Sequence, residues 1–132
     1  MAQVYGVDVS VVMAVFNGAR YLRDAVDSIL SQTFDAFELL VIDDGSTDAT
    51  PEMLSAYADP RMRVLRNAHN IGLTRSLNVG IRAASGAFIA RQDADDMSQP
   101  GRLEKQVAWL MAHPRVGLLG TGVVRTDGAD QV

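Results

Sequence analysis

Cysteine is absent from this chain of 132 residues, and its positive charges are few and scattered. Without cysteine there is no disulfide scaffold and no thiolate metal site, which fits a reducing compartment. The 12 Lys and Arg are outnumbered by 16 Asp and Glu, so the formal net charge is −4. Sequence-independent binding to nucleic acid requires clustered Lys and Arg, so we exclude nucleic acid as a partner.

Long apolar runs are also missing. The longest covers residues 9–16, whereas a membrane-spanning helix needs about 20 consecutive apolar residues. Residues 1–8 lack the basic segment followed by an apolar segment that marks a signal peptide. We therefore expect a cytoplasmic protein. Peripheral association with the inner face of the membrane would require a partner or sequence beyond these residues.

Apolar residues make up 48% of the chain and charged residues 21%, which is the balance of a folded globular protein. The length corresponds to about one domain. Short apolar runs alternate with stretches whose apolar residues recur every three or four positions, and they predict strands at 9–15, 37–42, 62–65, 88–90 and 116–119. We expect residues 1–132 to form one α/β domain, with a mainly parallel sheet covered by helices on both faces.

Helices are predicted between and after these strands. Their inward-facing residues are expected to be Leu22, Ala25, Val26, Ile29 and Leu30; Met53, Leu54 and Tyr57; Leu73, Leu77, Ile81 and Ala84; and Leu103, Val107, Leu110 and Met111. The N-cap candidates of the second helix are Ser46, Thr47, Asp48 and Thr50, and Pro51 suits its first turn.

Polar side chains follow the predicted strands at their carboxyl ends, where parallel sheets bind ligands. Phe16 and Asn17 follow the first strand, Asp43 and Asp44 follow the second, and the sequence DADD at 93–96 follows the fourth. Because the carboxyl ends of parallel strands lie at the same edge of a sheet, we expect the acidic groups at 43–44 and 93–96 to come toward one edge.

The DADD sequence places three carboxylates within four residues. Crowded like charges raise one another's pKa unless a cation neutralises them, and oxygen ligands suit Mg²⁺ or Mn²⁺. The alternative is a solvated acidic loop that caps the following helix. Asp43 and Asp44 also have two interpretations: a turn with Gly45 in the left-handed conformation, or an acceptor for a base or ribose. Arg75 either reaches a phosphate or is a solvated surface arginine.

Several segments taken together resemble the inverting glycosyltransferases of family 2. They are VSVVMAVFN at 9–17, SILSQTF at 28–34, FELLVIDDGSTD at 37–48, NIG at 70–72, DADD at 93–96 and PGRLEKQ at 100–106. The resemblance covers about residues 8–120. It implies a GT-A (Rossmann-like) fold and transfer of a sugar from a nucleotide-diphosphate donor to an acceptor hydroxyl with inversion, in bacterial polysaccharide or glycoconjugate synthesis.

The resemblance also implies roles for individual residues. The nucleotide-binding set is Ala14, Phe16 and Asn17 near the base or ribose, Asp44 or Asp43 as acceptor for the base, Arg75 toward a phosphate, and Asp93 toward the sugar or ribose. Asp95, with Asp96 beside it, is expected to contact Mn²⁺ or Mg²⁺ that bridges the donor's diphosphate. The family usually has proline where this chain has Ala14.

Family members generally run well beyond 132 residues, and their second half supplies the acceptor platform and the Asp or Glu that deprotonates the acceptor. No residue after Asp96 is a good candidate for this base, so we expect an N-terminal donor-binding portion with an incomplete C-terminal half. The expected acceptor is a saccharide or a lipid-linked group, and an incomplete sheet would favour a homo-oligomer.

Two alternatives remain at this point. A sugar-nucleotide pyrophosphorylase would carry a glycine-rich, basic loop after the first strand, which VFNGAR at 15–20 matches poorly. A non-catalytic nucleotide-binding or assembly module would retain the acidic edge without using it.

Overall fold

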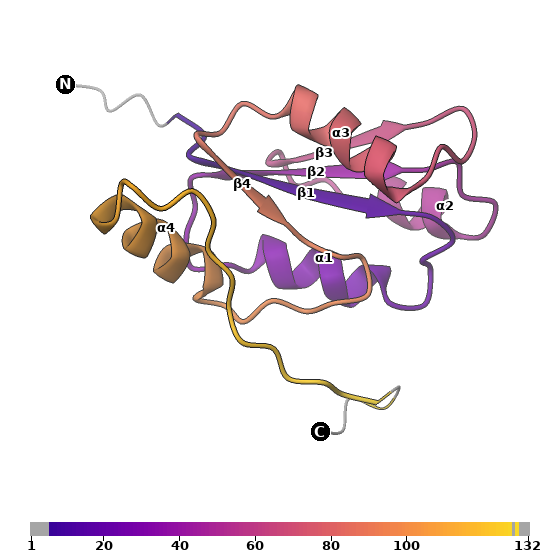
Figure 1. Cartoon of the computed structure of the whole chain (residues 1–132). Helices are drawn as coiled ribbons and strands as arrows, with labels where there is room; N and C mark the ends of the chain where they lie inside the picture. The colour runs from indigo at the N-terminus through magenta and orange to yellow at the C-terminus, as the bar shows by residue number, and fades with distance from the viewer. Residues whose placement is uncertain (1–5, 128, 130–132) are drawn as a thin grey trace.

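A parallel sheet with strand order β3–β2–β1–β4 lies at the centre of the chain in a computed structural model that describes residues 6–127 and 129 (Figure 1). Its strands are β1 (Val9–Val15), β2 (Phe37–Asp43), β3 (Met62–Arg66) and β4 (Phe88–Arg91). The helices are α1 (Leu22–Leu30), α2 (Thr50–Ser55), α3 (Leu73–Ala83) and α4 (Arg102–Ala112). Each of the three strand pairs is parallel, which confirms the predicted α/β fold class.

Helices cover both faces of the two central strands, so β1 and β2 are buried almost throughout. Side chains alternate between the faces. On one face, Val11 and Met13 belong to a core with the buried residues of α1 and with Leu54 of α2 and Leu103 of α4. On the other face, Val12 packs in a smaller core against α3. Figure 1 shows α3 and α1 on opposite sides of the sheet.

Gly80 allows α3 to lie close to the sheet. A Cβ atom at this position would come within 2.5 Å of Val12 Cγ1 and 2.6 Å of Ile42 Cδ1. Glycine normally costs stability inside a helix, so its presence in the middle of α3 is explained by this close approach.

The predicted strand at 116–119 is wrong. From residue 113 onward, the part of the chain that the structure describes contains neither helix nor strand, and Leu118 is 90% exposed. An apolar run becomes a strand only if a neighbouring backbone accepts its hydrogen bonds. β4 is one of the two edge strands of the sheet, and among the described residues it pairs with β1 alone.

Three residues that were expected to face inward are exposed instead: Leu73 at 53%, Ile81 at 48% and Met111 at 69%. Leu103 is the fully buried residue of α4, and Met111 follows it by eight positions. That spacing rotates a side chain by about 80° around the helix, away from the side on which Leu103 packs. The second helix is also shorter than expected, because α2 ends at Ser55 and Tyr57 packs against the core from beyond it.

None of the helices in the described residues has the length and apolar character that crossing a bilayer requires.

Candidate functional site

A pocket of about 380 Å³ opens at the carboxyl ends of β1 and β4. It is lined by Ala14, Val15, Phe16, Asn17, Gly18, Tyr21, Leu73, Arg91, Asp93, Ala94 and Asp95. Five residues that the sequence nominates for donor binding therefore meet in one place, although they come from segments more than 70 positions apart: Ala14, Phe16, Asn17, Asp93 and Asp95. The parallel arrangement of β1 and β4 brings these segments together.

The loop after β1 is held by the loop after β2. Ser46 Oγ accepts a hydrogen bond from the Asn17 backbone N–H at 3.0 Å, and Thr50 Oγ1 accepts one from Gly18 N–H at 3.0 Å. In return, Asn17 Oδ1 accepts hydrogen bonds from the backbone N–H groups of Thr47 at 2.8 Å and Asp48 at 3.3 Å. Asn17 has a φ of 50°, an unusual value for a residue other than glycine. These contacts fix the wall of the pocket.

Ser46, Thr47, Asp48 and Thr50 were expected to offer N-caps for the second helix. Of these four, Asp48 makes such a contact, since its Oδ1 accepts a hydrogen bond at 2.9 Å from the backbone N–H of Thr50, the first residue of α2. The N-cap of α2 is Ala49, which makes no side-chain capping bond. Ser46 and Thr50 instead bind the β1 loop, as does Asp48, whose Oδ2 accepts from Ala19 N–H at 3.2 Å. Pro51 does lie in the first turn of α2, as predicted.

Asp44 is buried, at 3% exposure, and its carboxylate organises the segment that leads into α3. It accepts hydrogen bonds from Asn67 Nδ2, Ile71 N–H and Gly72 N–H, each at 2.9 Å. Burial by itself would raise the pKa of Asp44, but these hydrogen bonds, with Ser76 nearby, hold it below its ordinary value. Asp44 does not line the pocket.

The Asp43 carboxylate is also buried, and its partners lie within the protein. Its Oδ1 accepts a hydrogen bond from Ser46 N–H at 2.9 Å, and its Oδ2 lies 3.5 Å from Arg66 Nε. Gly45 has a φ of 74°, and a Cβ atom there would come within 2.7 Å of the His69 carbonyl carbon. The turn interpretation therefore describes the observed backbone, whereas contact of Asp43 or Asp44 with a base stays a prediction.

The three acidic side chains of the 93–96 loop differ in their environments. Asp93 Oδ1 is paired with Arg91, at 3.0 Å from Nε and 2.9 Å from the terminal nitrogen. Asp96 lies outside the pocket lining, and burial, followed by the charges of Asp95 and Asp93, raises its pKa. Asp95 is exposed and accepts no hydrogen bond from any residue that the structure describes. Asp95 therefore offers the pocket an unpaired carboxylate.

The carboxylates of the 93–96 loop suit a metal ion whose coordination is completed by phosphate oxygens and water. Within residues 6–127 and 129, no group of three or more His, Cys, Asp or Glu side chains is arranged to hold a metal ion. Mg²⁺ is commonly bound through one or two carboxylates together with substrate phosphates and water, and Mn²⁺ suits the same oxygen ligands. Asp95 meets that requirement.

The residues that line the pocket differ in part from the predicted nucleotide-binding set. Arg75 is exposed on α3 and does not line the pocket. Tyr21, Leu73 and Arg91 do line it, and sequence reasoning missed them. Arg91 could have been found as the residue that ends the strand just before the acidic cluster, but Tyr21 and Leu73 carry no local signal.

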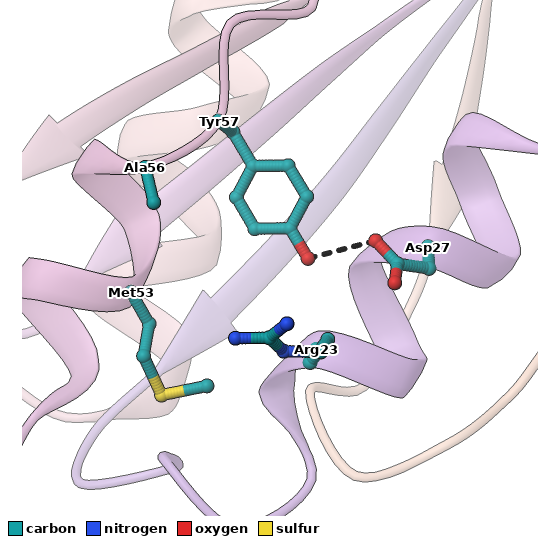
Figure 2. A pocket seen from close by; sticks show the side chains of 5 residues that line it. All are labelled: Arg23, Asp27, Met53, Ala56 and Tyr57. Atoms are coloured by element: carbon teal, nitrogen blue, oxygen red, sulfur yellow. Dashed lines mark hydrogen bonds between the residues drawn. The ribbon is translucent and has the colours of Figure 1, made fainter.

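A second, smaller pocket of about 160 Å³ lies between α1 and the end of α2 and contains none of the predicted site residues (Figure 2). Its lining residues are Arg23, Asp27, Met53, Ala56 and Tyr57. The Tyr57 hydroxyl donates a hydrogen bond to Asp27 Oδ1 at 2.8 Å, as Figure 2 shows. Burial, followed by this bond to Asp27, raises the pKa of Tyr57 to about 12. The contact joins α1 to the segment that follows α2.

Comparison with known proteins establishes the family. The model of the family described as "Glycosyl transferase family 2" matches residues 10–131. The chain belongs to this family. The succinoglycan biosynthesis protein ExoO of Rhizobium meliloti is 40% identical over 122 residues, which are 92% of this chain and 35% of that protein. The curated relatives that match first are more than twice as long as this chain.

Solved structures show the same architecture. Residues 1–349 of S. aureus TarS, in complex with UDP-GlcNAc, align with a TM-score of 0.77 and 27% identity, over 90% of this chain and 37% of that one. The mannosyltransferase PcManGT from Pyrobaculum calidifontis, in complex with GDP-Man and Mn²⁺, aligns with a TM-score of 0.72 and 29% identity, over 81% of this chain and 33% of that one. The GT-A fold expected from the sequence is confirmed.

Proposed function

We propose that this chain binds a nucleotide-diphosphate sugar with Mn²⁺ or Mg²⁺ and is the donor-binding part of an inverting glycosyltransferase. The observation that carries the proposal is the pocket in which the end of β1 and the loop after β4 meet. Ligands of parallel sheets bind at this edge. The TarS structure that resembles this chain holds UDP-GlcNAc, and the PcManGT structure holds GDP-Man and Mn²⁺.

The pocket residues have complementary roles in this proposal. Phe16, half exposed at the end of β1, offers a flat apolar surface to a nucleobase. Asn17 and Ala14 border the same side, and the Asp44 and Asp43 carboxylates support the neighbouring loop or accept a bond from the base. Asp93 is oriented by Arg91 toward the sugar or ribose.

The diphosphate would lie beside Asp95, with Asp96 adjacent in the loop. When bound, a divalent cation offsets the negative charge that grows on the leaving nucleoside diphosphate. Asp95 would hold it through its unpaired carboxylate. Arg75 lies outside the pocket lining, and its contact with a phosphate stays a prediction.

The remaining features of the enzyme are part of the same proposal. The chain spans less than half of the curated relatives that match first, and we place the acceptor site and the base that deprotonates the acceptor in the portion that those relatives have in addition. The acceptor would be a saccharide or lipid-linked group in polysaccharide synthesis, because the relative ExoO is named for succinoglycan biosynthesis. A cytoplasmic site of action, near the inner face of the membrane, and self-association belong to the proposal as well.

Titration calorimetry of the 132-residue chain with UDP and GDP, with and without Mn²⁺, tests the donor-binding step. We expect binding that Mn²⁺ strengthens, a loss of that strengthening in Asp95→Asn, and no change in the control Asp24→Asn, whose exposed carboxylate lies outside the pocket. Absence of metal-dependent binding in the parent chain would favour the alternative of a non-catalytic assembly module. The family assignment leaves no support for a pyrophosphorylase.

A further inference from the structure

Gln92 is a buried amide, 4% exposed, directly before the acidic loop. Its Nε2 donates hydrogen bonds to the backbone carbonyls of Asp93 at 3.1 Å and Asp96 at 2.7 Å. Its Oε1 accepts hydrogen bonds from Ser98 Oγ at 2.7 Å and from an Arg102 terminal nitrogen at 2.8 Å. A glutamine side chain has two donor hydrogens and two acceptor positions, so all of them are engaged in this arrangement.

Arg102, the first residue of α4, connects the same loop to the sheet and to the helix. One terminal nitrogen donates to Gln92 Oε1 and, at 2.9 Å, to Ser98 Oγ. The other terminal nitrogen donates to the Arg91 carbonyl at the end of β4, at 2.9 Å. Nε donates to Gln106 Oε1 at 3.0 Å. The planar guanidinium can make these bonds at once because its donors point in fixed directions.

Together, Gln92 and Arg102 bind the backbone or side chains at positions 91, 93, 96 and 98, on both sides of Asp95. Neither residue lines the pocket. Asp95 lines the pocket, and among the residues that the structure describes its carboxylate has no hydrogen-bond partner, while the backbone on both sides of it is held. Holding a ligand-binding group in position before the ligand arrives lowers the entropic cost of binding.

We infer that Gln92 and Arg102 are positioning residues that hold the 93–96 loop in the conformation in which Asp95 can bind a metal–nucleoside diphosphate. The inference rests on the proposed function, since it assigns these two residues to the same site. Their contribution passes through the loop backbone and requires no contact with the donor.

Gln92→Glu separates the two sides of the Gln92 network. A carboxylate still accepts from Ser98 and Arg102, so the link to α4 is kept. It has no hydrogen to donate, and its oxygen would face the carbonyls of Asp93 and Asp96. Loss of two hydrogen bonds of about 1 kcal/mol each corresponds to at least about tenfold weaker Mn²⁺-dependent UDP or GDP binding. Nucleotide affinity without Mn²⁺ should stay within about twofold.

Two further variants complete the design. Arg102→Lys keeps the positive charge, but one ammonium group cannot reach Gln92, Ser98 and the Arg91 carbonyl together, so we expect weaker Mn²⁺-dependent binding here too. Gln106→Met is the matched control, because it removes a hydrogen bond to the same guanidinium without touching the loop. It should bind Mn²⁺ and nucleotide as the parent does.

The second measurement is ¹⁵N relaxation of the Ala94, Asp95 and Asp96 amides, which does not depend on ligand binding. We expect order parameters near about 0.85 in the parent and in Gln106→Met, and below about 0.6 in Gln92→Glu. A stability difference common to the whole domain would not produce this local change.

The outcomes distinguish the inference from the proposed function. Parent-like Mn²⁺-dependent affinity in Gln92→Glu, or equal order parameters in the parent and Gln92→Glu, overturns the inference and leaves the function standing. Parent-like affinity in Arg102→Lys overturns the part assigned to Arg102. Absence of metal-dependent nucleotide binding in the parent overturns the function and, with it, the metal-positioning role.

Discussion

Glu38 is a carboxylate at the amino-terminal half of β2, on the opposite end of the sheet from the pocket, and only 7% of it is exposed. Its Oε1 accepts hydrogen bonds from Ser10 Oγ at 2.6 Å and from Ser85 N–H and Oγ, both at 2.8 Å. Arg63 lies 3.5 Å from Oε2. This network ties the segment after α3 to β1 and β2, and replacing Glu38 with glutamine tests its contribution to stability.

The expected effect follows from the number of bonds. Hydrogen bonds to a charged acceptor contribute about 1.5–3 kcal/mol and neutral ones about 0.5–1.5 kcal/mol, so neutralising the acceptor of three bonds removes roughly 3 kcal/mol. Part of this loss in stability is offset, because the neutral glutamine no longer places a charge in a buried position. We expect Glu38→Gln to lower the free energy of unfolding by about 2 kcal/mol at pH 7. For a domain of this length that corresponds to about 8 °C in Tm.

The difference should depend on pH. Burial by itself would raise the pKa of Glu38, but the bonds from Ser10 and Ser85, with Arg63 nearby, hold it below its ordinary value of 4.5. A carboxylate with a lowered pKa in the folded state stabilises the protein fully above its ordinary pKa and loses that contribution as the pH falls through the lowered one. The gap between parent and Glu38→Gln should therefore narrow below pH 4.5.

Urea denaturation followed by circular dichroism, at several pH values between 7 and about 3, measures this difference. Glu52→Gln is the control, because Glu52 is an exposed carboxylate on α2, and it should change stability by at most about 0.5 kcal/mol. Equal midpoints for the parent and Glu38→Gln at pH 7, or a gap that does not change with acid, would refute the reasoning.

Three further substitutions give sharp expectations. Gly80→Ala should lower the free energy of unfolding by about 1–2 kcal/mol despite alanine's better helix propensity, because its Cβ would overlap Val12 and Ile42; a rise in the urea midpoint would contradict the close approach. Asp44→Asn should cost about 2 kcal/mol in the same assay, since an amide cannot accept all three bonds that Asp44 receives, and an unchanged midpoint would argue against it. Asp95→Asn should leave stability within about 0.5 kcal/mol of the parent, because its side chain is exposed and unpaired among the described residues; a larger loss in thermal denaturation would indicate a structural role.

The regular elements could be predicted where a pattern is local. The continuous apolar runs that form β1 and β2 are buried on both faces, as their composition indicates. The run at 116–119 has similar composition but no neighbouring strand among the described residues, so it remains irregular. A strand requires hydrogen bonds from another segment, and residue composition cannot supply that information.

Some residues of the site could likewise be predicted from local sequence, whereas others could not. The sequence nominated Asp93 and Asp95 by their spacing, and Phe16 and Asn17 by their place after the first strand, and the fold brings them to one pocket. It could not show that the polar residues at 46–50 bind the loop after β1, because those contacts join positions about 30 residues apart. The same is true of Tyr21 and Leu73, which reach the pocket only after α1 and α3 have packed.

Composition and periodicity by themselves determined that this chain forms an α/β domain and which loops follow its strands, because both follow from the apolar pattern of short segments. Only the tertiary structure decided which carboxylates are available. Asp43 and Asp44 are engaged by backbone and side-chain donors, Asp93 is paired with Arg91, and Asp95 is left free among the residues described. The four are the same residue type, and only the donors that folding places around each one distinguish them.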